Sequence, residues 1–362
     1  MEINVIKAGI IGATGYAGME LVRLLSHHPE VSLVHLGSRS FEGTPYVDTV
    51  GSFRDATDTY ICKNATPREL APECDVIFLA LPHGIASQHI DEDILKSTCV
   101  IDLGADFRLK DVDMYQKWYG VKHGSPHLLS KSVYGLSELE RDAIASANLI
   151  ANPGCYTTCS ILTLAPLVQA GLVSRAETGT KPLPIIIDAK SGVSGAGRKE
   201  SQASHFCETN ESIKAYKIGS HRHTPEIEQY LQVISGNPLA VQFTPHLVPM
   251  NRGILVTAYI PLQSEQNPAI TTDDLRDLYI SLYKGEKFIR VLPKGVFPET
   301  RWVKGSNFVD IGITFDERTR TIVAVGAIDN LIKGAAGQAV QNMNIRFGFD
   351  EAASLDAIPL FP

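Results

Sequence analysis

The fold is decided by residues 5–18, VIKAGIIGATGYAG, an apolar run that leads into a glycine-rich turn. The run predicts a buried β-strand, and the apolar spacing of residues 15–26 predicts a helix directly after it. Gly12, Gly15 and Gly18 allow a tight turn and let a pyrophosphate approach the start of the helix. The spacing is GxxGxxG and not GxGxxG, so the position at a first strand-to-helix turn carries the prediction of a dinucleotide site. The alternative is a glycine-rich turn that binds no nucleotide.

The residues after the second expected strand, 31–36, indicate which dinucleotide binds. An acidic residue at the end of this strand would hydrogen-bond the ribose of NAD. The chain has Ser38 and Arg39 there instead, and a hydroxyl beside a guanidinium suits the 2′-phosphate of NADP. A solvated surface arginine is the alternative for Arg39. The cofactor-binding residues expected in this part of the chain are Gly12, Thr14, Gly15, Tyr16, Gly18, Ser38 and Arg39.

Short apolar runs alternate with amphipathic stretches in residues 1–152, which is the pattern of βαβ units. Residues 75–81 form a nearly continuous apolar run, as expected of a strand buried on both faces. With the shorter runs 100–103 and 149–151, they predict a Rossmann-type α/β fold with a doubly wound parallel sheet. We therefore expect residues 1–152 to form an NADP-binding domain.

Strand-like runs dominate after residue 152 and predict a second, α+β domain with a mostly antiparallel sheet over residues 153–329. The runs are residues 184–189, 244–250, 254–262, 308–315 and 321–328. We expect this domain to hold the catalytic residues and to provide the surface of a homo-oligomer, a dimer or a tetramer. Residues 330–344 have the apolar spacing of a helix, which needs a surface to pack on. We expect residues 330–362 to return to the NADP-binding domain.

Cys155 stands in the segment NPGCY, between the expected strand 149–151 and a helix that begins there. The N–H groups and the dipole at a helix start stabilise a thiolate and lower the pKa of the thiol. We therefore expect Cys155 to be a nucleophile. The alternative, a packed core cysteine, fits Cys74, Cys99 and Cys159.

A proton acceptor for this thiol is expected in the segment His221-Arg222-His223, which precedes a helix with Pro225 in its first turn. Both imidazoles lie on one side if the segment is extended. A histidine of near-neutral pKa can take the thiol proton and later return it to an oxygen. The alternative is a polar loop, and the segment alone does not distinguish His221 from His223. The histidines expected at the surface are His27, His28 and His89.

Arginines are the candidates to hold an anionic substrate. Arg108 follows an expected parallel strand, where ligands bind in such sheets, and is the first choice for a phosphate or carboxylate. Arg198 and Arg252 are second choices, with a surface ion pair as the alternative. The small-residue loop SGVSGAGR, which begins at Ser191 and Gly192, lets backbone approach a ligand. It is expected to contact the nicotinamide end of the cofactor or a phosphate, and a flexible turn is the alternative.

Composition and charge argue against several partners. The chain has 362 residues and a net charge of −7 without a basic block, which argues against nucleic acid. No stretch approaches the ~20 apolar residues of a membrane span, and we expect neither a membrane partner nor a signal peptide. The six cysteines form no zinc pattern, so no metal site is expected. Scattered thiols in a chain of this size indicate a reducing cytoplasm.

Nine segments, taken together and in this order, are highly specific. They are GATGYAG (12–18), LPHG (81–84), IDLGADFRL (101–109), YGLSEL (134–139), NPGCY (152–156), KSGVSGAGR (190–198), HRHTPEI (221–227), HLVPMNRGI (246–254) and DNLIKGAAGQAVQNMN (329–344). They resemble, over nearly the whole chain, the N-acetyl-γ-glutamyl-phosphate reductase family of arginine biosynthesis. That family is similar to aspartate-semialdehyde dehydrogenase in fold and chemistry, and the HRHTPE segment separates the two.

The resemblance implies that the chain reduces N-acetyl-γ-glutamyl phosphate with NADPH to N-acetylglutamate semialdehyde and phosphate. Cys155 would attack the acyl phosphate, and the resulting thioester would be reduced to a thiohemiacetal that releases the aldehyde. His221 would be the acid/base, and His223 would help bind substrate. The resemblance also places Pro82 and Asn330 at the cofactor, with Asn330 near the nicotinamide.

Three alternatives stay open. The first is a reductase for an acid one carbon longer, such as N-acetyl-aminoadipyl phosphate, because one methylene changes binding by only ~1–3 kcal/mol. The second is an aspartyl-phosphate reductase, which the HRHTPE segment disfavours. The third is a Rossmann-type NADP sensor that regulates a partner, and such a protein would need neither Cys155 nor His221.

Overall fold

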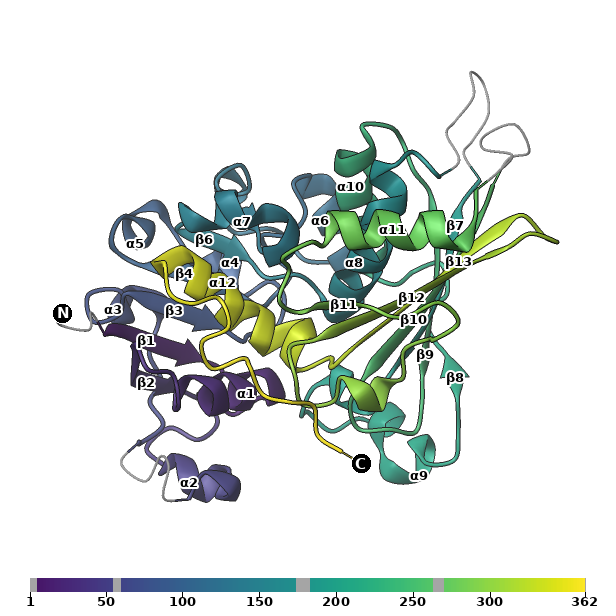
Figure 1. The fold of residues 1–362 in the computed structure, drawn as a ribbon. Helices are drawn as coiled ribbons and strands as arrows, with labels where there is room; N and C mark the ends of the chain where they lie inside the picture. Colours follow the sequence, from purple (N-terminus) through teal and green to yellow (C-terminus); the bar gives the residue numbers. More distant parts are fainter. Residues whose placement is uncertain (1–4, 55–59, 174–182, 263–269, 362) are drawn as a thin grey trace. The chain divides into compact units, whose positions relative to one another are not determined.

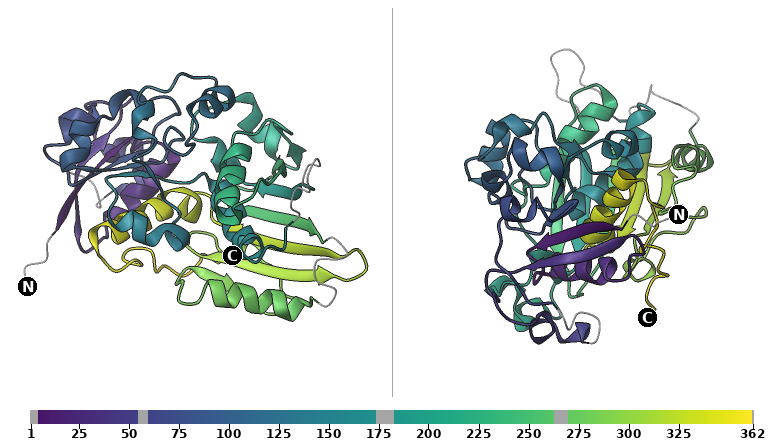
Figure 2. Two further views of the ribbon diagram at one scale, coloured as in Figure 1. Left: turned by 90° about the horizontal axis from the view of Figure 1, so that it is seen from above. Right: turned by 90° about the vertical axis from the view of Figure 1, so that its left-hand side faces the viewer.

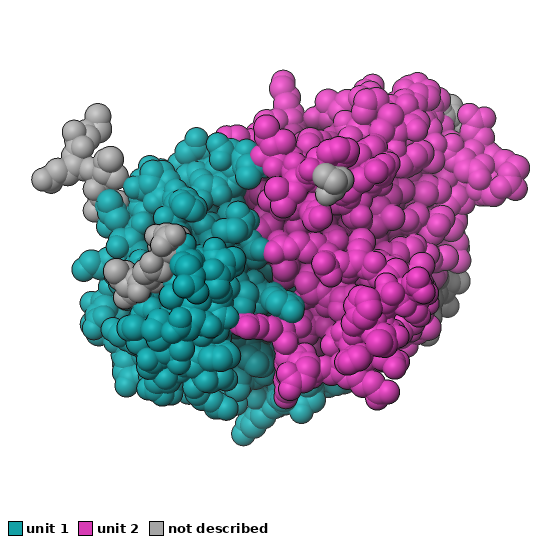
Figure 3. Space-filling view, turned by 90° about the horizontal axis from the view of Figure 1, so that it is seen from below, with its two compact units in different colours: residues 1–154, 335–357 teal, residues 155–334, 358–362 magenta. Residues whose placement is uncertain are grey.

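The chain divides into two compact units. The computed structural model describes residues 5–54, 60–173, 183–262 and 270–361. The first unit comprises residues 1–154 and 335–357, and the second comprises residues 155–334 and 358–362, coloured separately in Figure 3. The chain therefore passes from one unit to the other three times.

The first unit contains a six-stranded sheet in which every strand pair is parallel, in the order β2-β1-β3-β4-β6-β5. Its strands are β1 (Ile6–Ile11), β2 (Val31–Gly37), β3 (Val76–Leu79), β4 (Cys99–Asp102), β5 (Val133–Tyr134) and β6 (Leu149–Ala151). The strand order reverses at β1, because β2 lies on one side of it and β3 on the other. In doubly wound sheets ligands bind at the carboxyl ends of the strands at such a point. The predicted parallel α/β fold is confirmed.

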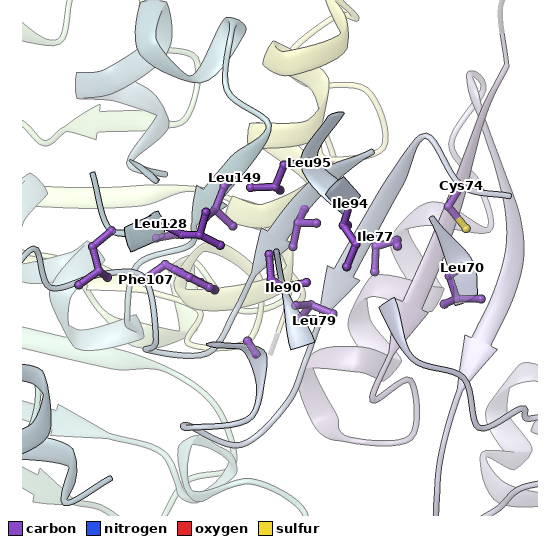
Figure 4. Close-up of a cluster of buried hydrophobic side chains, with 14 residues drawn as sticks. Leu70, Cys74, Ile77, Leu79, Ile90, Ile94, Leu95, Phe107, Leu128 and Leu149 are labelled. Carbon is purple, nitrogen blue, oxygen red and sulfur yellow. The ribbon is translucent and has the colours of Figure 1, made fainter. Parts of the chain in front are cut away.

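Short helices cover this sheet, and apolar side chains fill the space between them (Figures 1 and 4). The helices from the N-terminal part of the chain are α1 (Tyr16–Leu25), α2 (Tyr46–Thr49), α3 (Pro67–Leu70), α4 (Ala86–His89), α5 (Glu92–Ser97), α6 (Val112–Tyr119) and α7 (Ser137–Ala145). All four residues of β3 are buried, because helices lie on both faces of a doubly wound sheet. One core cluster joins Ile77 and Leu79 of β3 to Ile94 of α5 and to Phe107.

The last helix, α12 (Gly337–Phe347), belongs to the first unit and packs against α1 and α7, as Figures 1 and 2 show for α1. A single π turn, Ile332–Ala336, precedes it. Its buried polar side chains bond within the unit: Gln338 Nε2 donates to the carbonyl oxygen of Gly135 at 2.9 Å, and Asn342 Nδ2 donates to the same oxygen at 2.8 Å. Buried amides are tolerated when bonded in this way.

The second unit contains a seven-stranded mixed sheet, in the order β11-β12-β13-β10-β7-β9-β8. Its strands are β7 (Ile185–Ser191), β8 (Lys214–Ala215), β9 (Val241–Leu247), β10 (Ile254–Pro261), β11 (Ile289–Val291), β12 (Val309–Asp316) and β13 (Thr321–Ile328). Four of the six strand pairs are antiparallel, which confirms the predicted mostly antiparallel sheet. The helices are α8 (Cys155–Gln169), α9 (Phe206–Thr209), α10 (Thr224–Ser235) and α11 (Thr272–Leu282).

Helix α8 is the central helix of the second unit. It packs against β10, β13, α10 and α11, and every residue from Tyr156 to Val168 is buried. Pro166 lies inside the helix and cannot donate to the carbonyl oxygen four residues earlier, which belongs to Leu162. The hydroxyl of Tyr283 donates to that oxygen instead. The carbonyl oxygen of Leu162, which the proline leaves without a donor from the helix, is therefore hydrogen-bonded, and the helix continues past the proline.

The tail from Ile358 onward groups with the second unit. The backbone N–H of Leu360 donates to the carbonyl oxygen of Lys304 at 2.8 Å, and the Leu360 side chain lies against Gly305. No helix among the described residues is long and apolar enough to cross a membrane.

Candidate active site

Cys155 is the first residue of α8, is half-buried and takes part in no disulfide. The chain reaches it through Asn152, Pro153 and Gly154, all buried. In the first unit Asn152 is held on several sides: its N–H donates to the carbonyl oxygen of Asp102 at 2.9 Å, and its side-chain Nδ2 donates to that of Ala335 at 3.1 Å. The turn that leads into the cysteine is therefore fixed by its own hydrogen bonds.

A glycine backbone lies directly against the cysteine. A Cβ atom placed on Gly334 would lie 2.8 Å from Cβ of Cys155 and 3.2 Å from its Cα. Real Cβ atoms do not approach each other this closely, so any side chain at position 334 must displace the cysteine. Gly334 was not singled out from the sequence as a site residue, although it stands in the segment DNLIKGAAG.

Aromatic rings and two imidazoles surround the start of α8. The ring of Tyr156, the residue after Cys155, lies 5.7 Å from that of His221 and 6.0 Å from that of His223, centroid to centroid. The two imidazoles are 4.8 Å apart. Two further rings contact His221, Tyr216 at 5.6 Å and Phe243 at 5.2 Å. We call Tyr156, Tyr216, His221, His223 and Phe243 the aromatic cluster.

Burial and charge tie this cluster to the cysteine. Burial, and to a smaller extent the negative charge of the Cys155 thiolate, raise the pKa of Tyr216 to about 12. The same two effects, with Tyr216 as a further neighbour, raise the pKa of Tyr156. The Tyr216 hydroxyl donates to the Tyr156 hydroxyl at 3.4 Å. Both phenols are therefore neutral hydrogen-bonding groups close to the thiol at ordinary pH.

His221 is 9% exposed and is held by the backbone of the segment that carries it. Its Nδ1 accepts the backbone N–H of His223 at 3.1 Å, just before α10 begins. Burial lowers the pKa of His221 to about 2, and the positive neighbours His223, Lys217 and Arg222 add to the effect. His221 is therefore neutral at ordinary pH. The structure brings both predicted histidines to the same cluster.

A second group of predicted residues meets at the end of β7. Asn330, 2% exposed, donates from Nδ2 to Ser194 Oγ at 3.0 Å and accepts the N–H of Gly253 at its Oδ1, at 2.8 Å. Ser191 and Gly192 begin the same loop, and a Cβ on Gly192 would lie 2.6 Å from the carbonyl oxygen of Asn251. The loop is therefore a packed turn anchored by Asn330.

The two second-choice arginines differ in their surroundings. Arg252 lies next to this loop, with NH1 3.7 Å from Oδ2 of the fully buried Asp329. That carboxylate also accepts the backbone N–H groups of Gly305 and Leu331, at 2.7 and 2.8 Å. Arg198 is exposed at the far end of the loop. Arg252 is thus partly committed to an ion pair, but with a buried carboxylate, whereas the alternative considered was an ion pair at the surface.

The glycine loop of the first unit joins β1 to α1. Gly12 has φ +90°, and a Cβ on it would lie 2.3 Å from the carbonyl oxygen of Ala80. A Cβ on Gly18 would lie 2.1 Å from the carbonyl oxygen of Gly12. Gly15 caps α1 without a side-chain hydrogen bond, so no capping side chain competes with an anion for the first N–H groups of the helix. Gly12 and Gly18 are therefore required by the packing of the turn itself, and the helix start beside them is where a dinucleotide phosphate can bind.

The end of β2 meets the same loop. Ser38 Oγ and Thr14 Oγ1 are 2.9 Å apart, so the two hydroxyls predicted to bind cofactor are neighbours. Arg39 and Tyr16 are exposed beside them. Pro82 is exposed at the end of β3, the strand next to β1. The structure therefore brings the predicted cofactor residues of the first unit to the carboxyl ends of β1, β2 and β3.

A buried carboxylate that the sequence analysis missed holds the segment after β3. Asp106 is fully buried, and its carboxylate accepts the backbone N–H groups of Gly84 at 2.7 Å and Ser87 at 2.9 Å and the hydroxyl of Tyr115 at 2.7 Å. Nearby Arg108 is 5% exposed and donates to the carbonyl oxygens of Asn152 and Leu103, each at 2.8 Å. Part of this guanidinium therefore supports the backbone, the turn before Cys155 included.

No cluster of metal-ligating side chains occurs in the described part of the chain. The aromatic cluster and Cys155 belong to the second unit, and the glycine loop belongs to the first.

Two family models match this sequence. The NAD-binding domain of semialdehyde dehydrogenase matches residues 7–147, and the dimerisation domain of semialdehyde dehydrogenase matches residues 155–330. The boundary between them falls where the structure divides, before Cys155.

Curated relatives match over the full length. The N-acetyl-gamma-glutamyl-phosphate reductase of Lachnospira eligens is 52% identical over 99% of this chain and 100% of that protein. The enzyme of the same name from Lachnoclostridium phytofermentans is 51% identical over the same shares. That from Campylobacter jejuni subsp. doylei is 50% identical over 97% of this chain and 98% of the other.

Solved structures agree in fold. The aspartate semialdehyde dehydrogenase II of Vibrio cholerae, complexed with ASA, superposes with a TM-score of 0.71 at 19% identity, over 95% of this chain and 98% of that one. The aspartate semialdehyde dehydrogenase of Candida albicans with NADP gives 0.64 at 20% identity, over 94% and 98%. At these identities the likeness establishes the fold alone.

Proposed function

Because the chain belongs to the N-acetyl-γ-glutamyl-phosphate reductase family, we propose that it reduces N-acetyl-γ-glutamyl phosphate to N-acetylglutamate semialdehyde with release of phosphate. The reaction is a step of arginine biosynthesis, and the reductant is NADPH. The observation that carries the proposal is Cys155 at the first position of α8, next to Tyr156, whose ring contacts that of His221. A sensor that only bound the dinucleotide would need no such group.

Cys155 supplies the nucleophile. The start of α8 stabilises its thiolate, which attacks the acyl carbon while phosphate leaves. A thioester holds the acyl group in place and splits one difficult step into two easier ones. Packing against the Gly334 backbone supports this role, because it fixes the sulfur-bearing residue without hiding it.

The glycine loop supplies the cofactor site. We place the phosphates of NADPH over Gly12, Gly15 and Gly18, with Thr14 and Tyr16 beside them. Ser38 and Arg39 would hold the 2′-phosphate, and the exposed position of Arg39 at the end of β2 supports this. Pro82, Ser191, Gly192 and Asn330 are the residues assigned to the remaining cofactor contacts. When bound, NADPH supplies the hydride that reduces the thioester.

The substrate is an anion at both ends, so cations and imidazoles should bind it. His223, next to His221 in the aromatic cluster, is proposed to contact the substrate. Arg108, Arg198 and Arg252 are the candidates for its phosphate and its carboxylate. Arg108 already donates to two carbonyl oxygens, so only part of its guanidinium would serve the ligand.

We also propose that the protein is a homo-oligomer in a reducing compartment such as the cytoplasm. The match to a dimerisation domain supports self-association. One sheet face in the second unit carries Ile186 of β7 and its register partner Tyr259 of β10, both exposed and apolar, which suits a second copy. A reducing compartment keeps Cys155 a thiol.

The test runs the reaction in reverse with purified protein. NADP, phosphate and one aldehyde are mixed, and NADPH is followed by absorbance, with N-acetylglutamate semialdehyde, its aminoadipate homologue and aspartate semialdehyde in separate samples. The first aldehyde should give the highest kcat/KM, and the Cys155→Ala variant should be inactive with all three. No reduction with any aldehyde would refute the enzyme, and full turnover by Cys155→Ala would refute the thioester. A preference for either other aldehyde would reassign the substrate.

A further inference from the structure

Asp106, the buried carboxylate that follows β4, determines the path of the segment that leads from β3 into α4. Its Oδ1 accepts the backbone N–H of Gly84 at 2.7 Å, and its Oδ2 accepts that of Ser87 at 2.9 Å. Because Asp106 is fully buried, both N–H groups point into the interior of the first unit. Pro82, two residues before Gly84, is exposed. The carboxylate therefore holds residues 82–87 in a turn with two of its amides inside and Pro82 outside.

Asp106 is itself held at its side chain and at its backbone. The hydroxyl of Tyr115 donates to Oδ1 at 2.7 Å, and Nε2 of His123 donates to the backbone carbonyl oxygen of Asp106 at 2.7 Å. The ring of Tyr115 is stacked on that of Tyr119, with the centroids 5.0 Å apart, and Tyr119 packs against His83 of the segment at 5.1 Å. A buried polar network that is hydrogen-bonded in this way makes the structure around it rigid. The turn of residues 82–87 is therefore formed before any ligand binds.

The segment starts at the glycine loop, on the side of β1 away from β2. The carbonyl oxygen of Ala80 would lie 2.3 Å from a Cβ on Gly12. Strand β2, which leads to Ser38 and Arg39, lies on the other side of β1. In a doubly wound sheet a dinucleotide lies across the point where the strand order reverses, with one mononucleotide half on each side. If Ser38 and Arg39 hold the 2′-phosphate of the adenosine half, the nicotinamide half belongs over the segment after β3.

We propose that Asp106 is a positioning residue for the nicotinamide half of the dinucleotide, acting through residues 82–87 and not by contact with the cofactor. The inference rests on the proposed cofactor site and extends it to a residue behind that site. The carboxylate is fully buried and accepts three hydrogen bonds, so it supports the segment from the interior. A segment that is already ordered loses less conformational entropy when a ligand binds, and this difference increases affinity. Without Asp106 the ligand would have to order the segment itself.

The main test measures binding and not turnover. Dissociation constants of NADPH and of adenosine 2′,5′-bisphosphate, which lacks the nicotinamide half, are measured by calorimetric titration of the full chain. In Asp106→Asn one oxygen becomes an NH2 group, so the N–H of either Gly84 or Ser87 faces another donor. We expect Kd for NADPH to rise by about tenfold or more, because hydrogen bonds to a charged group are lost. Kd for the bisphosphate should stay within about twofold of the wild type, since its site lies on the β2 side.

A milder variant and two matched controls accompany this measurement. Tyr115→Phe removes one donor to Asp106 and keeps the shape of the ring, and we expect Kd for NADPH to rise by about threefold. The controls are buried residues of the second unit: Asp310→Asn, whose carboxylate is bonded by Arg290, and Tyr279→Phe, whose hydroxyl donates to a backbone carbonyl oxygen. Each control loses a buried hydrogen bond of the same kind. Both should lower the urea midpoint and leave the two dissociation constants unchanged.

The outcomes separate this inference from the proposed function. Unchanged Kd for NADPH in Asp106→Asn and Tyr115→Phe would overturn the proposal. Equal losses for NADPH and the bisphosphate would also overturn it, since they would show general damage to the first unit. If Asp106→Asn does not fold, the same comparison in Tyr115→Phe decides. A wild type that binds neither compound would refute the proposed cofactor site, whereas a wild type that binds both tightly leaves the result to the variants alone.

Discussion

Two strand-to-helix turns hold the residues proposed to carry the chemistry of this chain, and they are built on different principles. The turn from β1 into α1 is constrained by backbone at short range: Gly18 contacts Gly12, and Gly12 contacts Ala80. The turn from β6 into α8 delivers Cys155, whose surroundings come from distant parts of the chain, among them Tyr216 and Gly334. The first turn depends mainly on its own glycines, whereas the second turn depends on side chains and backbone from elsewhere in the chain.

The difference explains why the local sequence reveals the packing constraint of the first turn, whereas in the second turn it reveals the cysteine but not the groups around it. A glycine pattern records a place where no Cβ fits, and for Gly18 the obstructing carbonyl oxygen, that of Gly12, lies inside the pattern. A cysteine before a helix records only a possible thiolate, and the groups that make it useful are chosen by the tertiary fold. The comparison predicts that substitutions in the first turn act on stability and those around the second act on turnover.

The largest effect is expected at Gly18. In Gly18→Ala the new Cβ would lie 2.1 Å from the carbonyl oxygen of Gly12, and both partners are backbone. We expect the free energy of unfolding to fall by about 3 kcal/mol, since overpacking here cannot be relieved by a rotamer change. The matched control is Gly15→Ala, whose Cβ would meet that same oxygen at an ordinary 3.5 Å. Urea unfolding of the two cofactor-free variants makes the comparison, and equal midpoints would contradict it.

Gly334→Ala should separate turnover from stability. Its Cβ would lie 2.8 Å from Cβ of Cys155, so the sulfur must shift. Because small misplacements of a reacting group are costly, we expect kcat to fall by about 10–100-fold, with a smaller loss of stability than in Gly18→Ala. Gly51→Ala, where a Cβ meets nothing within 4 Å, controls for a glycine substitution as such. Unchanged kcat in Gly334→Ala would show that the contact has no catalytic importance.

The smallest effect is expected at Arg39, which is proposed to bind the cofactor and to act together with the first turn only through it. Arg39→Ala removes a charged donor to the proposed 2′-phosphate, and such hydrogen bonds contribute about 1.5–3 kcal/mol. We expect KM for NADP to rise by at least about tenfold while KM for NAD stays nearly constant. Arg68→Ala removes an exposed arginine of the same unit, paired with Asp91, and should change neither value. Equal losses for both dinucleotides in Arg39→Ala would refute the assignment.

Much of the architecture could be predicted because it follows from apolar periodicity. Strands β6 and β13 begin and end at their predicted bounds, and α8 begins at Cys155. The two-residue strands β5 and β8 could not be predicted, since so few residues show no alternation.

His28 shows the other limit of prediction. It was expected at the surface and is 5% exposed, because its Nε2 bonds to Asn344 Oδ1 at 2.9 Å, 316 positions later in the chain. Asp106 was missed for a similar reason: its partners Gly84 and Ser87 are fixed only once the sheet has formed. Polar residues whose partners are remote carry no local signal, whereas the glycine loop and NPGCY do.

The place of α12 has a consequence for how the protein is made. The carbonyl oxygen of Gly135 accepts its hydrogen bond from Gln338, 203 positions later, and the hydroxyl of Ser137 donates to Oδ1 of Asn342, 205 positions later. Domains near the N-terminus usually fold as they leave the ribosome. In this chain, the polar groups of Gly135 and Ser137 have no hydrogen-bond partner from α12 until nearly the whole chain has been synthesised, so the first unit cannot finish folding earlier. The unit that binds the dinucleotide is therefore the first to be started and the last to be finished.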